Sequence, residues 1–143
     1  MMRLWGRKSS INVQKVLWCL AELGLEEGKD FERIDAGLHF GRNRTPEGER
    51  NYEAIRKAYQ DSSALLTLLD QQLINQQYCS GNTFHIGDIP LVLCVSRWTL
   101  LNQTFPNQTG LRPILNNIDA WMKRIEEGTQ YKVVAEKELN VIK

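Results

Sequence analysis

Near its N-terminus the chain carries the stretch LWGRKSSINVQKVLWCL, at residues 4–20. A short apolar segment leads into a polar turn that contains Ser9 and Ser10, and a segment with helical periodicity follows. We therefore expect both serines to lie where a helix begins, beside backbone N–H groups that have no partner within the helix. Because the aligned peptide dipoles make that end of a helix electropositive, the turn is suited to hold an anion, and a thiolate is one such anion.

The segments around this turn predict a strand–helix–strand unit. We expect strands at residues 3–5 and 31–34, and between them a helix at residues 12–23 on which apolar side chains recur every three or four positions. Gly24 suits a helix end. Two strands joined by a helix at this spacing are typical of a right-handed parallel βαβ unit.

The rest of the chain is predicted to be helical. A polar loop at residues 35–53, in which Thr45-Pro46-Glu47 offers a helix start, precedes an amphipathic helix at residues 52–76. The segment at residues 86–102 has almost no polar face and belongs at the centre of a bundle. A last clear helix is expected from Pro113 to Gly128, with a further short helix in the tail. The predicted fold class is mostly α (α+β), with a partial domain at residues 1–47 and an α-helical domain at residues 48–143.

Composition excludes several classes of function. The 143 residues are 42% hydrophobic and carry a net charge of +1, which supports a packed core and gives no electrostatic reason to expect nucleic acid or a membrane surface as partner. No long apolar run predicts a signal peptide or a membrane span. The three cysteines are widely spaced and form no CxxC motif, so we expect reduced thiols in a cytoplasmic protein.

Ser10 has two possible roles in the turn. Its hydroxyl suits a helix N-cap, which is a common role of serine. The same hydroxyl can donate a hydrogen bond to a bound thiolate, which lowers the thiol pKa and increases the amount of nucleophile at neutral pH. Nearby Arg7 and Lys8 would attract an anionic ligand or lie on a solvated edge. The two roles of Ser10 do not exclude each other.

The remaining polar candidates each have a structural alternative. His39 lies in a loop that can approach a ligand or simply face solvent, and neither histidine has neighbours at metal-ligand spacing, so no metal site is expected. Asp88 is expected to be structural, because an acid there can accept hydrogen bonds from first-turn N–H groups. Arg97 and Trp98 lie on the most apolar helix, where they would line a substrate pocket or pack in the core.

Two stretches resemble a known family. One joins the turn to VQKVLWCLAELGL at residues 13–25, and the other is YCSGNTFHIGDIPL at residues 78–91. Both are similar to glutathione transferases of the bacterial, serine-type, theta-like branch. The second stretch resembles the folding motif of their helical domain, although His85 stands where threonine is usual.

This resemblance implies a thioredoxin-like N-terminal domain, a helical C-terminal domain, a homodimer and a role in detoxification. It implies glutathione as co-substrate, a small electrophile as second substrate and no cofactor. Ser10 matches the catalytic serine, Ser9 and Asn12 are its neighbours in the glutathione site, and His39 falls in a loop that borders that site in relatives.

The chain also departs from the family pattern. Relatives hold glutathione with a Val-Pro pair and a Glu-Ser pair, and this sequence contains neither. An internal deletion joined at residues 45–47 would remove both, together with the second half of the thioredoxin-like domain. The sequence therefore predicts a truncated βαβ unit followed by a helical bundle, with impaired transferase activity. A non-catalytic remnant of a transferase, or a helical binding module, is the alternative.

Overall fold

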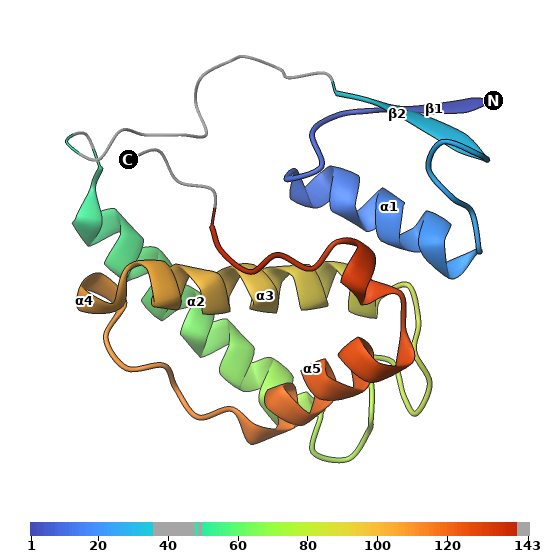
Figure 1. Cartoon of the computed structure of the whole chain (residues 1–143). Helices are drawn as coiled ribbons and strands as arrows, with labels where there is room; N and C mark the ends of the chain where they lie inside the picture. Colours follow the sequence, from blue (N-terminus) through green and yellow to red (C-terminus); the bar gives the residue numbers. More distant parts are fainter. Residues whose placement is uncertain (36–47, 49, 140–143) are drawn as a thin grey trace.

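The computed structural model describes residues 1–35, 48 and 50–139 (Figure 1). The described elements follow one another as β1 (Met2–Trp5), α1 (Ile11–Glu22), β2 (Phe31–Ile34), α2 (Tyr52–Gln72), α3 (Asp88–Thr104), α4 (Pro106–Thr109), α5 (Asn116–Gly128) and the 3₁₀ helix η2 (Tyr131–Val133). The fold is mostly helical, with one short parallel sheet, as the sequence predicted. No described helix is long and apolar enough to cross a membrane.

The two strands form the predicted parallel pair, with α1 as the connection between them. Met2 pairs with Phe31 and Trp5 pairs with Ile34, so the ladder is only four residues long. The N–H of Gly6 extends it by donating to the carbonyl of Ile34 over 2.9 Å. A sheet of two strands buries little surface by itself, so the unit depends on what α1 packs against.

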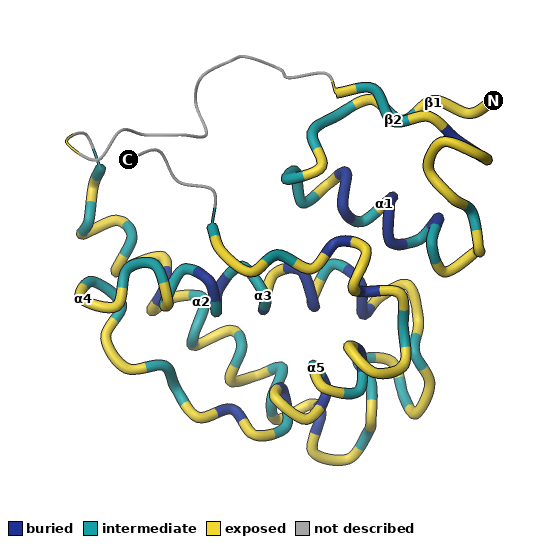
Figure 2. Tube along the Cα trace, viewed as in Figure 1, coloured by how far each residue is buried: buried dark blue, intermediate teal, exposed yellow. Residues whose placement is uncertain are grey.

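The helical part is built around α3. This helix packs against α1, α2 and α4, and its apolar side chains on several faces are buried, as the lack of a polar face predicted (Figures 1 and 2). From α5, Ile118, Trp121 and Ile125 are fully buried, and the indole N–H of Trp121 donates to Asp88 of α3 over 3.0 Å. The apolar stripe of α2 faces the bundle, with Tyr59 buried, whereas Leu68 is exposed.

A single hydrophobic cluster joins the βαβ unit to the helical part. Its centre is Trp18 of α1, which is 0% exposed. The Trp18 ring stacks on Phe84 at a centroid distance of 5.8 Å and meets Tyr131 of η2 at 5.1 Å. The indole N–H donates to Glu22 over 2.7 Å. The apolar face of α1 is therefore covered by the chain's own helical part and tail.

Several helix boundaries differ from the prediction. The last long helix begins at Asn116 instead of near Pro113, and Ile114, which lies inside the expected helix range, is 83% exposed. Leu115 before the helix has a non-helical backbone, with a φ of −126° and a ψ of 76°, so the proline belongs to an approach segment. After α3, Pro106 starts the short α4, because proline is well suited to the first helical position. The expected helix at residues 52–76 ends at Gln72.

Asp88 is fully buried at the start of α3, and its carboxylate holds three segments together. One oxygen accepts hydrogen bonds from the N–H of Cys79 over 2.9 Å and from the indole N–H of Trp121 over 3.0 Å. The other oxygen accepts from the N–H of His85 over 2.9 Å. We expected bonds to first-turn N–H groups. The carboxylate instead reaches back to the preceding loop and across to α5.

Replacing Asp88 by alanine should therefore lower the free energy of unfolding by about 3 kcal/mol, because one buried and two part-buried donors would lose their acceptor. Urea denaturation measures the change. Asp61→Ala is the matched control, since its carboxylate is exposed on α2 and pairs with the exposed Lys57; we expect this variant to lose less than about 0.5 kcal/mol of stability. Equal stabilities of the two variants would contradict this account of Asp88.

Candidate functional site

The serine turn, defined here as residues 6–10, joins β1 to α1. Ser10 occupies the N-cap position, its backbone carbonyl accepts from the N–H of Gln14 over 2.8 Å, and its N–H donates to the carbonyl of Arg7 over 3.0 Å. Its side chain makes no cap hydrogen bond within the described part of the chain. The backbone thus fixes the position of Ser10 and leaves its hydroxyl available to a ligand at the electropositive end of α1.

Two arginines hold this turn from opposite elements. Arg33 of β2 donates to the carbonyl of Gly6 over 3.0 Å and forms an ion pair with Glu27 at 3.3 Å. Arg97 of α3 donates to the carbonyl of Ser9 over 2.6 Å. The turn is therefore anchored both to the sheet and to the helical part.

Gly6 permits the turn to pass close to α1. Its φ of +145° lies in a region that residues with a side chain rarely adopt. A Cβ at this position would lie 2.5 Å from Cγ2 of Val13, whose side chain is buried. No other residue type can take this place without moving the turn or the helix.

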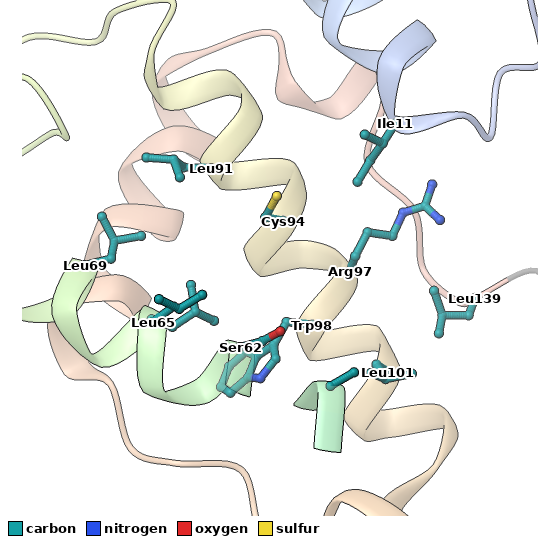
Figure 3. A pocket seen from close by; sticks show the side chains of 12 residues that line it. Ile11, Ser62, Leu65, Leu69, Leu91, Cys94, Arg97, Trp98, Leu101 and Leu139 are labelled. Atoms are coloured by element: carbon teal, nitrogen blue, oxygen red, sulfur yellow. The ribbon is translucent and has the colours of Figure 1, made fainter. Parts of the chain in front are cut away.

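An apolar cavity of about 570 Å³ lies between α2 and α3 and extends to the start of α1 (Figure 3). Ile11, directly after Ser10, lines one end of it. Most of the other lining residues are leucines or other apolar side chains, contributed by α2, α3 and the tail; they include Leu65, Leu66, Leu69, Leu91, Cys94, Leu101 and Leu139. This lining suits an uncharged, apolar ligand.

Arg97 and Trp98 both line this cavity, and both also serve the packing around it. Trp98 is nearly fully buried; its ring stacks on Tyr59 at 5.1 Å, and its indole N–H donates to Ser63 over 3.1 Å. Figure 3 shows Arg97 reaching from α3 towards Ile11. Its charge is paired with Glu136 at 3.2 Å, so the cavity does not offer an unpaired cation.

The structure brings some of the predicted site residues together and leaves others apart. Ser9 and Ser10 are half-buried in the serine turn, and Asn12 is exposed one helical position beyond Ile11, with its side-chain oxygen accepting from Lys15 over 3.2 Å. His39 lies outside the described residues. Asp88 belongs to the core contacts given above. No group of three or more potential metal ligands occurs within the described ranges.

Sequence reasoning missed Gln14 and Glu136, which lie beside the turn. Gln14 is only 2% exposed, and its side-chain amide donates to Glu136 over 2.7 Å. A polar residue on the buried face of an otherwise apolar helix was the available signal for Gln14. Nothing in the sequence indicated Glu136, because the contact joins residues that are 122 positions apart.

The comparisons with known proteins show a glutathione-transferase-like fold. Two solved structures of a theta class glutathione S-transferase from the citrus canker pathogen Xanthomonas axonopodis pv. citri, one with glutathione bound and one apo, superpose with TM-scores of 0.73. Each match has 24% sequence identity and covers 94% of this chain. The match covers 96% of the solved chain in the glutathione-bound structure and 97% in the apo structure. The two-stranded sheet is consistent with a truncated thioredoxin domain. No protein-family model and no curated protein matches the sequence.

Gly6→Ala should destabilise the protein by about 3 kcal/mol, since it combines an unfavourable φ with a steric clash. Gly24→Ala is the control without a steric clash: Gly24 has a φ of +73°, in the left-handed helical region, and no described atom lies within 4 Å of a Cβ built there. We expect this variant to lose about 1 kcal/mol of stability. Chemical denaturation of both variants measures the difference. If both variants lost the same stability, the contact with Val13 would not constrain the turn.

Cysteine alkylation should report on the apolar cavity. Burial, followed by the hydrogen bond and charge of Asp88, raises the pKa of Cys79 to about 12, and burial also raises the pKa of Cys19. Cys94 is exposed in the cavity lining. Iodoacetamide near neutral pH should therefore modify Cys94 first, as mass spectrometry would reveal, and Cys94→Ala should remove that product. A saturating neutral dye such as Nile red should slow the reaction; preferential labelling of Cys79 would contradict this assignment.

Proposed function

We propose that the chain is a glutathione S-transferase-like protein with reduced activity, which conjugates glutathione to small apolar electrophiles. The observation that carries the proposal is the hydroxyl of Ser10, which is not engaged in capping α1 and belongs to the residue directly before Ile11, a lining residue of the apolar cavity. A glutathione-transferase-like fold supports the same assignment.

In the proposed reaction Ser10 donates a hydrogen bond to the sulfur of glutathione. The hydroxyl and the N-terminus of α1 both favour the thiolate over the thiol, whose ordinary pKa is about 8.5. The thiol proton leaves to solvent. The thiolate then forms a carbon–sulfur bond with the electrophile, and either a leaving group departs with its electron pair or an atom of an unsaturated acceptor takes up the pair and is protonated.

Other residues have supporting roles in this proposal. Ser9, Asn12 and His39 are assigned to glutathione, and Arg97 and Trp98 to the pocket of the electrophile. The cavity lining favours an uncharged electrophile, since burying a charge there without a partner would be costly. We further propose a cytoplasmic homodimer, with neither nucleic acid nor membrane as a partner.

Glutathione should bind weakly. The chain lacks both the Val-Pro and the Glu-Ser pair that anchor glutathione in relatives, so fewer interactions hold the tripeptide. Those missing pairs also favour the alternative, a non-catalytic remnant that retains the helical bundle as a binding module. Calorimetric titration with glutathione separates the two: saturable binding in the millimolar range or tighter supports the transferase, and no heat with an unchanged melting temperature supports the remnant.

Ser10→Ala should abolish conjugation of a chromogenic aryl halide and leave the melting temperature nearly unchanged, because the hydroxyl makes no cap bond. Asn51→Ala is the matched helix-cap control. The Asn51 side chain accepts from the N–H of Ala54 over 2.9 Å, so its loss should cost about 1 kcal/mol of stability while turnover per folded molecule persists. Unchanged conjugation in Ser10→Ala would disprove the proposed role of the serine.

A further inference from the structure

We infer that Arg97 and Glu136 are positioning residues for the serine turn: together they fix the peptide between Ser9 and Ser10 and balance the charge around it. The expected effect on bound glutathione rests on the proposed function. The restraint on the serine turn rests only on the contacts that Arg97 and Glu136 make. Neither residue needs to touch glutathione for this role.

The contacts form a closed network between three separate segments. Nη2 of Arg97 in α3 lies 2.6 Å from the carbonyl oxygen of Ser9, 3.2 Å from Oε2 of Glu136 in the tail and 3.5 Å from Oε1 of Gln14. Glu136 in turn accepts from the Gln14 amide over 2.7 Å. Arg97, Glu136 and Gln14 therefore hold one another in place beside the turn.

The position of the shortest contact gives the network its effect. The Ser9 carbonyl belongs to the peptide that carries the Ser10 N–H, so the guanidinium restrains the plane of that peptide and with it the Cα of Ser10. Gln14 lies one turn further along α1, and its backbone N–H donates to the carbonyl of Ser10. The network therefore fixes both sides of the residue whose hydroxyl must meet the sulfur, and a fixed donor needs no rearrangement when the anion forms.

The charges of the pair have opposite effects on an anion at Ser10. The guanidinium favours a thiolate, and the Glu136 carboxylate disfavours it. Other charged or titratable groups described near the turn and the pair include Arg7, Lys8, Lys15, and Arg33 with Glu27 and Asp35, together with Tyr131, whose pKa burial raises. These groups stay the same when only one member of the pair is changed. A change in the ionisation of bound glutathione then reports on the altered member alone.

Hydrogen exchange tests the positioning directly and needs no activity. In Arg97→Met the side chain keeps its apolar stem and loses the donor, so peptides covering residues 6–11 should exchange about tenfold faster than in the unaltered protein. Arg124→Met is the control, because Arg124 also donates to a backbone carbonyl, that of Gln77 over 2.7 Å, but in a different part of the fold. It should accelerate exchange near residue 77 and leave residues 6–11 unchanged. Unchanged exchange of residues 6–11 in Arg97→Met would overturn the inference.

The pH dependence of kcat/KM for glutathione conjugation tests the charge balance. Arg97→Met should raise the pH of half-maximal activity by about half a unit, and Glu136→Gln should lower it by a similar amount. Arg97→Lys should restore the midpoint in part, whereas Arg124→Met should not move it. A purely structural clamp would reduce rates in both variants without opposite shifts, and identical midpoints would remove the electrostatic part of the inference.

The two measurements separate the inference from the proposed function. Faster exchange of residues 6–11 in Arg97→Met, in a protein without Ser10-dependent conjugation, would retain the positioning role and reject the transferase. Ser10-dependent conjugation with unaltered exchange and unaltered midpoints would retain the transferase and reject the role of Arg97 and Glu136.

Discussion

The packing of Trp18 against the helical part is the interaction on which the rest of the structure depends. A parallel pair of four-residue strands is not stable by itself. Exposing the wide apolar face of the connecting helix to water would cost free energy. Trp18 places that face against Phe84 and Tyr131, two aromatic side chains from separate parts of the helical region. Once α1 is fixed in this way, its N-terminal end, and with it the serine turn, has a defined place above α3.

The position of the turn brings together a polar and an apolar environment. On one side lie backbone groups and paired charges, which hold Ser10 at the electropositive end of α1. On the other lies a leucine-rich cavity that begins at Ile11. A reaction between a polar thiol and an apolar electrophile requires such a boundary. Arg97 belongs to both environments, because its stem lines the cavity and its guanidinium binds the turn.

The sequence contained enough information to predict the main helices and strands and the general location of the candidate site. It contained too little to predict the long-range contacts that hold the site residues in place. Helical periodicity found α1 and α2, because repeated apolar positions reflect local geometry, and a nearly continuous apolar segment found α3. The approach segment before α5 was missed because Ile114 continues the apolar pattern although it faces solvent. The bonds of Asp88 to Trp121 and of Gln14 to Glu136 join distant residues, and no local pattern encodes which distant partner a buried polar group will find.

The dependence of α1 on η2 also affects how the chain can fold during synthesis. The ribosome releases the βαβ unit first, but Tyr131, which covers Trp18, is among the last described residues to emerge. Until then the first helix has no complete partner surface, and its apolar face is open to chaperones or to other nascent chains. We therefore expect the N-terminal unit to become ordered only after the segment that carries Tyr131 has been translated.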